Sequence, residues 1–299
     1  MIRKYFKSEK TESWFLLFIL SVIWGSSFIL IKKGLEVFSP VQVGTIRISF
    51  AFLILLPFAL RHLKGIPGEK WKIIFFTGMV GNLIPAILFA LAETKIESSL
   101  TGILNALSPL FTLLIGIYVF RYRISFLQIS GLATGFIGTL GLGFVNSSGG
   151  IGALNLYVWL IVIATFCYGI CLNFIKAYLS DMRAMVVTSL AMFSIGPFAL
   201  IYLFSTDFIF IVNNHSGASE ALAFIAVLGI FGTAIGLVLY TRLIIMTTAF
   251  FASIVTYLIP VVAIFWGMVD NESLYPLHFA GMILIMMGIY IINKSEIRN

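Results

Sequence analysis

Long apolar segments restrict what this chain can fold into more than any other feature of its sequence. They lie at approximately 14–33, 40–60, 71–92, 98–119, 125–145, 154–176, 184–204, 222–244, 250–269 and 275–293. An α-helix needs about 20 apolar residues to cross a bilayer. Runs such as ALAFIAVLGIFGTAIGLVLY lack the alternation of apolar and polar residues that a membrane barrel strand requires. We therefore expect an all-α membrane protein with ten transmembrane helices.

The composition supports this fold class. Apolar residues make up 60% of the chain and charged residues only 10%, and the mean hydropathy is +1.08. Soluble domains contain far fewer apolar residues. The net charge of +7 could suggest nucleic acid, but the basic residues lie between apolar segments and form no continuous patch. We expect the lipid bilayer, and no nucleic acid, as a partner.

Basic residues are divided unequally between the two alternate sets of loops. One set holds most of the 19 Lys and Arg residues, whereas the other holds Lys32, Lys33 and Lys95, and Arg47 lies within an apolar segment. Loops rich in Lys and Arg remain in the cytoplasm. The pattern predicts a multi-pass protein of the cell membrane with both termini in the cytoplasm.

Two stretches of the sequence share one pattern. VIWGSSFILIK begins at residue 22 and FCYGICLNFIK at residue 166, 144 positions later, and each has an aromatic residue, a glycine and a lysine seven residues after that glycine. Further matches follow at offsets of 151 and then 150 positions: Gly78 with Gly229, Gly81 with Gly232, Pro109 with Pro260, Gly116 with Gly267, Gly131 with Gly281, and Gly138 with Gly288. We interpret this ordered series as a duplication, with one repeat at 1–147 and a second at 148–299.

Each half contains five segments, so the second half should enter the membrane in the opposite sense from the first. An inverted repeat provides two packings of similar energy that are related by exchange of the membrane faces. Alternating access around a site at the midplane requires such a pair of packings. The two inverted five-helix repeats make transport the leading functional class.

The order of several motifs carries a family resemblance. The WG pair of the first segment, SPLFTLLIG at 108–116, IPVVAIFWG at 259–267 and FAGMILIMMGIYI at 279–291 resemble the EamA family of the drug/metabolite transporter superfamily. The resemblance implies a ten-helix exporter of small metabolites, often amino acids or related compounds, in the cell membrane. The family often has an acidic residue just after helices four and nine. Here Glu272 follows that pattern, but Arg121 occupies the aligned position of the first half.

Polar and aromatic residues inside the apolar segments are candidates for a substrate site. A proline leaves the carbonyl four residues earlier without its helical partner. Pro109 thus frees the carbonyl of Asn105. Pro260 frees that of Thr256 in the same way. These carbonyls could line a cavity, or a neighbouring helix could satisfy them at a packing kink. The remaining candidates, which could equally serve helix packing, are Trp24, Ser27, Asn82, Tyr168, Asn173, Tyr240 and Tyr257.

Arg47 is a further candidate, because it lies about seven residues into the second segment. A charge at that depth is costly unless it faces protein or water. Its guanidinium group could hold a substrate carboxylate through paired donors. The alternative is a structural ion pair with Glu93 or Glu97, which the position nearer the outer surface slightly favours.

Other classes of site lack their sequence signals. The histidines lie far apart, with no cysteine or carboxylate at metal-ligand spacing. No G-x-x-x-x-G-K-[ST] loop is present to hold nucleotide phosphates. We therefore expect no metal, no cofactor and no enzymatic activity. Glu93 is the only carboxylate near a segment interior, which favours facilitated diffusion or exchange over obligate proton antiport.

We predict a secondary transporter that exports a small metabolite, an amino acid or related compound, by alternating access. We expect a monomer, and glycine pairs four residues apart leave a dimer open. A passive channel for small solutes is the first alternative, although the scattered polar residues form no pore-lining stripe. An intramembrane enzyme is the second, although buried His, Asp and Glu residues are scarce.

Overall fold

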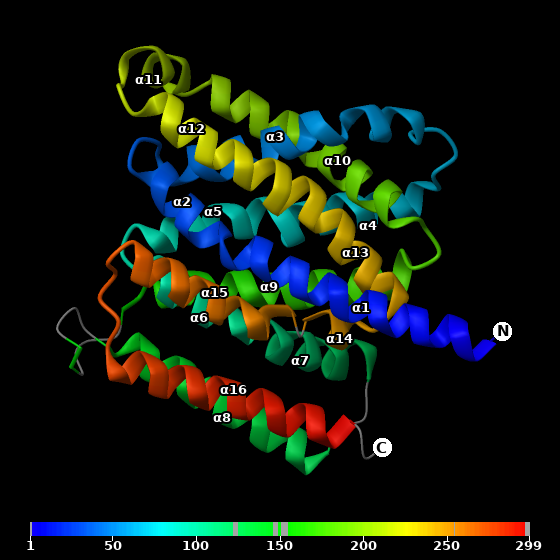
Figure 1. Ribbon diagram of the computed structural model, residues 1–299. Helices are drawn as coiled ribbons and strands as arrows, with labels where there is room; N and C mark the ends of the chain where they lie inside the picture. The colour runs from blue at the N-terminus through cyan, green and yellow to red at the C-terminus, as the bar shows by residue number, and fades with distance from the viewer. Residues whose placement is uncertain (1, 122–124, 146–148, 151–154, 254, 297–299) are drawn as a thin grey trace.

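The computed structural model is a helical bundle. It describes residues 2–121, 125–145, 149–150, 155–253 and 255–296, so the boundary expected between residues 147 and 148 lies outside the described residues. Figure 1 shows the helices packed side by side, with the N-terminus and the C-terminus at the same end of the bundle. The described part of the chain forms helices and no strand.

Several of the apolar segments comprise two or three helical elements. The elements, in order, are α1 (Ile2–Gly25), α2 (Ser27–Leu35), α3 (Pro40–Arg61), α4 (Gly68–Gly78), η1 (Met79–Leu83), α5 (Ile84–Glu93), α6 (Ser98–Leu104), η2 (Asn105–Leu107), α7 (Ser108–Phe120), α8 (Phe126–Gly143), α9 (Val158–Tyr178), α10 (Ala184–Phe204), α11 (Phe208–Asn214), α12 (Ala218–Val227), η3 (Leu228–Ile235), α13 (Gly236–Met246), α14 (Ala249–Ser253), α15 (Val255–Val269) and α16 (Pro276–Glu296). The two elements η1 and η3 are π-helical, and η2 is a 3₁₀ turn.

Eight helical stretches, judged by the length and composition of their described residues, could cross a membrane. They are Thr11–Leu35, Pro40–Arg61, Gly68–Glu93, Ser98–Phe120, Val158–Tyr178, Ala184–Phe204, Ala218–Met246 and Ala249–Val269. Two shorter apolar helices, Ile129–Leu142 and Pro276–Gly288, occupy the two remaining segments expected from the sequence. The number of ten membrane crossings stays a prediction.

The outer faces of the helices carry large apolar side chains. Phe15, Phe126 and Ile201 are all more than half exposed. Exposed apolar surface of this extent is unfavourable in water. It suits contact with lipid acyl chains, and the buried apolar residues pack in the interior between the helices.

The two π-helical elements occur at corresponding positions of the two halves. In η1 the Asn82 side chain donates through Nδ2 to the Thr77 carbonyl at 3.2 Å. In η3 the Thr233 hydroxyl donates to the Leu228 carbonyl at 3.3 Å. Both bonds reach five residues back, and both residues of the second pair lie 151 positions after those of the first. A π-turn widens the helix and often marks a functional site.

Helix contacts also occur in corresponding pairs. A Cβ atom added to Gly25 would lie 2.5 Å from the Val262 Cβ atom, and one added to Gly169 would lie 2.7 Å from the backbone carbon of Phe111. Gly169 lies 144 positions after Gly25, and Val262 lies 151 positions after Phe111. These contacts seat α1 against α15 and α9 against α7. The close approach explains why glycine is needed at both positions.

Helices α8 and α16 form a closely packed pair at one edge of the bundle (Figure 1). Gly138 faces the backbone carbonyl of Gly281, and Gly288 faces the backbone of Gly131. A Cβ atom at position 288 would lie 2.5 Å from the Gly131 carbonyl oxygen. Because the atoms in contact belong to backbone, no side-chain rotation could relieve such a clash.

We predict that Gly288→Ala lowers stability, because the added methyl group would push α8 and α16 apart at a cost of about 1–3 kcal/mol. Gly141→Ala on α8 is the matched control, since a Cβ atom there has no neighbour within 4 Å. Thermal unfolding of the purified protein in detergent measures both variants. Equal unfolding temperatures for the two variants would contradict the packing described.

Candidate functional site

One cavity lies inside the bundle and takes its walls from both halves of the chain. Its volume is about 100 Å³. Most of the residues singled out from the sequence lie on its wall: Trp24, Ser27, Arg47, Asn82, Asn105, Tyr168, Tyr240 and Thr256. Asn173 and Tyr257 lie outside the lining. A mostly apolar cavity with a few converging polar groups is the usual form of a small-molecule site.

Two aromatic pairs form parts of the wall. Trp24 contacts Tyr240 edge to face, with ring centroids 4.6 Å apart, and Tyr168 stacks on Phe89 at 5.9 Å. Tyr168 lies 144 positions after Trp24, and Tyr240 lies 151 positions after Phe89. The Trp24 indole Nε1 also donates to the Gly232 carbonyl in η3 at 2.8 Å. The aromatic walls are therefore fixed by packing and by a hydrogen bond.

The carbonyl freed by Pro109 is satisfied within its own segment. The Ser108 hydroxyl donates to the Asn105 carbonyl oxygen at 2.9 Å, so the partner is not the neighbouring helix considered from the sequence. The Thr256 hydroxyl donates to the Ser253 carbonyl at 2.9 Å. Asn105 and Thr256 both line the cavity.

Four threonines on the wall were missed from the sequence. Thr233 in η3 lines the cavity, and so do Thr77, Thr188 and Thr241. The hydroxyls of Thr188 and Thr241 lie 3.0 Å apart. The repeat could have indicated Thr233, because it lies 151 positions after Asn82. Nothing in the sequence distinguishes the other three from threonines that bond only to their own helix.

Arg47 reaches the cavity from α3 without an acidic partner. Its Nε atom donates to the Thr233 hydroxyl at 3.1 Å. None of the ion pairs among the described residues joins it to Glu93 or Glu97. Glu97 lies 3.8 Å from Lys32 instead. Glu93 is buried, and neither carboxylate oxygen has a hydrogen-bond partner in the described structure. The structural ion pair considered from the sequence is therefore absent here.

Asn173 and Tyr257 have surroundings typical of packing. The Asn173 side chain donates through Nδ2 to the Thr112 and Gly169 carbonyls, both at 2.9 Å. It thereby joins α9 to α7 in a buried position. The Tyr257 ring packs against the largest apolar cluster. A direct role of these two residues in substrate binding stays a prediction.

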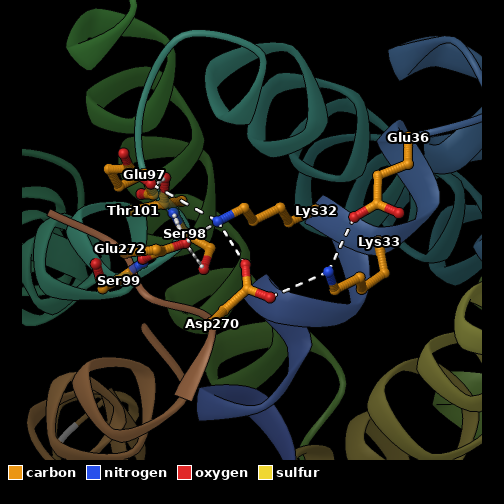
Figure 2. A network of polar contacts seen from close by, with 9 residues as sticks. All are labelled: Lys32, Lys33, Glu36, Glu97, Ser98, Ser99, Thr101, Asp270 and Glu272. Carbon is orange, nitrogen blue, oxygen red and sulfur yellow. Dashed lines mark hydrogen bonds and ion pairs between the residues drawn. The ribbon is translucent and has the colours of Figure 1, made fainter. Parts of the chain in front are cut away.

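A network of charged residues joins three segments (Figure 2), and one member, Lys32, directly follows the cavity-lining residue Ile31. Lys32, near the end of α2, lies 2.7 Å from Asp270 and 2.8 Å from Glu272, which both belong to the link between α15 and α16. Lys33 lies 3.0 Å from Asp270 and 2.9 Å from Glu36. Lys32 and Lys33, at the end of α2, thus bind the link between α15 and α16.

Glu272 is the most buried member of this network, with 0% of its side chain exposed. It accepts hydrogen bonds from the Ser98 backbone at 3.1 Å, from the Ser98 hydroxyl at 2.6 Å and from the Ser99 backbone at 2.9 Å (Figure 2). These donors lie in the first turn of α6. Pairing and hydrogen bonds of this kind offset the cost of burying an ionised carboxylate.

The network shifts the pKa values of its carboxyl groups in different directions. The hydrogen bond from Lys32 holds the pKa of Asp270 below its usual range. Burial alone would raise the pKa of Glu272, but its hydrogen bonds, led by that from Lys32, hold it below the usual value. Burial and repulsion from Glu272 raise the pKa of Glu97. Asp270 and Glu272 are therefore the ionised partners of the lysine.

The corresponding positions of the other half carry different groups. Lys176, which lies 144 positions after Lys32, donates to the Ile245 carbonyl at 3.0 Å. Arg121 occurs 151 positions before Glu272, so the two halves differ in charge where their helices end. Among the described residues no group of three His, Cys, Asp or Glu side chains could hold a metal ion.

The chain is similar to transporters over nearly its whole length. The sequence model of the EamA-like transporter family matches it twice, at residues 12–144 and 155–294. An "Uncharacterized transporter" of Archaeoglobus fulgidus is 27% identical over 95% of this chain and 100% of its own. The "Uncharacterized inner membrane transporter YedA" of Escherichia coli is 25% identical over 94% of this chain and 90% of its own.

Two further comparisons extend this result. A "Probable amino-acid metabolite efflux pump" of Escherichia coli is 25% identical over 91% of this chain and 92% of its own. A solved structure described as "Crystal structure of protein" has a TM-score of 0.67 at 12% identity, over 96% of this chain and 98% of its own, and this likeness shows the fold alone. With the two family matches, the chain belongs to the EamA-like transporter family, as the order of its motifs predicted.

Proposed function

We propose that this protein is a secondary transporter that exports a small metabolite, an amino acid or related compound, across the cell membrane by alternating access. The cavity lined by both halves carries this proposal, because a solute bound there contacts helices that can move relative to one another. The name of the related E. coli protein, an amino-acid metabolite efflux pump, supports both the proposed substrate class and the outward direction of transport. Both termini would lie in the cytoplasm.

We further propose ten transmembrane helices in two inverted five-helix repeats, residues 1–147 and 148–299. The family model matches each half separately. The π-helical elements η1 and η3, the aromatic pairs of the cavity and the glycine contacts all have counterparts at the repeat offsets. Paired contacts of this kind are what two similar halves produce when each packs against the other.

The charged network of Lys32, Asp270 and Glu272 would close the outer end of the cavity. Basic residues are scarce in the loops on this side, which the distribution of charge assigns to the outside. The network ties α2 to the start of α6 and to the link before α16. These contacts must separate before a solute can leave outward, so their strength sets part of the barrier to opening.

We predict that Trp24→Ala and Asn105→Ala reduce solute counterflow in proteoliposomes several-fold more than they reduce folded protein in the membrane. Both residues line the cavity, whereas Trp14 and Asn214 are exposed and lie outside its lining. Trp14→Ala and Asn214→Ala are therefore matched controls. Saturable counterflow identifies a carrier. Unsaturable conductance would indicate a channel, and a covalent product would indicate an enzyme.

We expect facilitated diffusion or exchange, because no carboxylate among the described residues lines the cavity. A pH gradient imposed on proteoliposomes should not drive uphill accumulation of the solute, and Glu93→Gln should retain counterflow. Leak through liposomes without protein is the control. Uphill accumulation that Glu93→Gln abolishes would instead establish proton antiport through this residue.

We predict that Lys32→Gln lowers stability by up to about 3 kcal/mol, because it leaves the buried Glu272 carboxylate without its cation. Lys33→Gln is the matched control and should cost about 1 kcal/mol or less, since its partners Glu36 and Asp270 are more exposed than Glu272. The Asp270 and Glu272 pKa values are lowered on folding, so the network stabilises the protein above their ordinary pKa values and loses this effect as the pH falls through the lowered ones.

Thermal unfolding in detergent measures this dependence on pH. The difference between Lys32→Gln and the unmodified protein should be largest near neutral pH and should shrink below about pH 4. A difference that is independent of pH would show that Lys32 stabilises the protein by packing alone.

A further inference from the structure

We propose that Arg47 is the carboxylate-binding residue of the cavity and that the transported solutes are organic carboxylates with an apolar body, whose amino group is not required. This inference rests on the proposed function, since it names the substrate class of the same site. It predicts a wider class than amino acids and excludes cationic amines. The argument depends on the charge, the geometry and the symmetry of the cavity wall.

Arg47 is the only charged residue that lines the cavity in the described part of the chain. The other polar groups of the wall are neutral hydroxyls, amides and rings, and no Asp or Glu side chain is among them. Surrounded mostly by apolar wall, a single cation attracts an anion more strongly than it would in water. The wall therefore has one site for a negative group and no acidic partner for an ammonium group.

The hydrogen bond of Arg47 leaves its terminal nitrogens available. Only Nε is used, and it donates to the Thr233 hydroxyl at 3.1 Å. Thr233 is itself held, because its hydroxyl donates to the Leu228 carbonyl at 3.3 Å within η3. Among the described residues no other hydrogen bond or ion pair holds the guanidinium group. The two terminal nitrogens can then bind both oxygens of one carboxylate, a geometry that lysine does not provide.

The positive charge is present in one half of the chain only. A Cβ atom on Gly229 would lie 2.8 Å from the Arg47 carbonyl oxygen, and one on Gly78 would lie 3.0 Å from the Ala191 carbonyl oxygen. Ala191 is therefore the counterpart of Arg47, 144 positions later, and it also lines the cavity. Two similar halves would not need this difference in charge. The single positive charge of Arg47 would orient a carboxylate toward α3, and the aromatic pairs would then contact the apolar body of the solute.

An isolated charge in this position would otherwise be a liability. A cation within a transmembrane helix is costly unless it is paired or solvated, and the carboxylates of Glu93 and Glu97 form no ion pair with it. A bound anionic solute supplies the missing partner. The charge-assisted bonds to that anion contribute to affinity and selectivity.

Binding of three solutes that share one skeleton tests the proposal. They are phenylalanine, 3-phenylpropanoate, which lacks the ammonium group, and phenethylamine, which lacks the carboxylate. Affinity is measured by calorimetry on the full-length protein in detergent at neutral pH. A second set with a smaller body is leucine, 4-methylpentanoate and isopentylamine. We expect both carboxylates of at least one set to bind, and the corresponding amine to bind at least about tenfold more weakly.

Variants then assign the effect to Arg47. Arg47→Gln should weaken carboxylate binding about 10- to 100-fold. Arg47→Lys keeps the charge but loses the paired donors, so its affinity should lie between those of Arg47→Gln and the unmodified protein. Thr233→Val keeps the guanidinium but removes its hydrogen bond, and should weaken binding less than Arg47→Gln. Lys95→Gln removes an exposed cation and is the control for net charge, with unchanged affinity expected.

Several results would overturn the proposal. They are equal binding of an amine and its carboxylate, unchanged carboxylate affinity in both Arg47 variants, and no binding of any carboxylate in either set. Binding of 3-phenylpropanoate should also fall as its own carboxyl group is protonated, and independence from pH would count against the proposal. Counterflow of a mixed metabolite pool by the unmodified protein is measured in parallel. If it persists, transport stands although the assignment of Arg47 fails.

Discussion

The shortage of hydrogen-bonding partners in the hydrocarbon core of a membrane is the constraint on which the rest of this structure depends. Backbone polar groups placed there must find partners within the protein. The side chains of Asn82 and Thr233 supply such partners, because each donates to a carbonyl five residues back within a π-helical turn. The same widened turn places the Gly232 carbonyl where it accepts from Trp24. The hydrogen bonds that satisfy these polar atoms thus also shape the wall of the cavity.

The chemistry that we propose depends on residues that differ between the two halves. The matched glycine contacts and aromatic pairs supply a scaffold in which both halves contribute alike. The charges do not follow this rule, because Arg47 corresponds to Ala191 and Glu272 corresponds to Arg121. A scaffold with similar halves can adopt two packings of similar energy. Unmatched charges then give the two ends and the two walls different affinities for ions and solutes.

The residues of the candidate site were most readily predicted where their type is unusual in an apolar helix. Arg47, Asn82 and Trp24 stand out in this way, and the structure places all of them on the cavity wall. Asn173 has the same signal but bonds to two carbonyls outside the lining. Thr188 gives no signal, because a threonine hydroxyl can bond within its own helix at any position. The residue type therefore indicates that a side chain needs a polar partner, but not whether that partner is a solute or another part of the protein.

The sequence by itself determined the helical class, the family and the series of corresponding positions, because apolar length and residue spacing act along the chain. Only the tertiary structure decided which polar groups face one another. Glu272 reaches Lys32 across a separation of 240 residues, and Arg47 meets Thr233 rather than Glu93 or Glu97. Such pairings depend on how helices distant in sequence pack and rotate, and hydropathy along one segment carries no information about its neighbours in space.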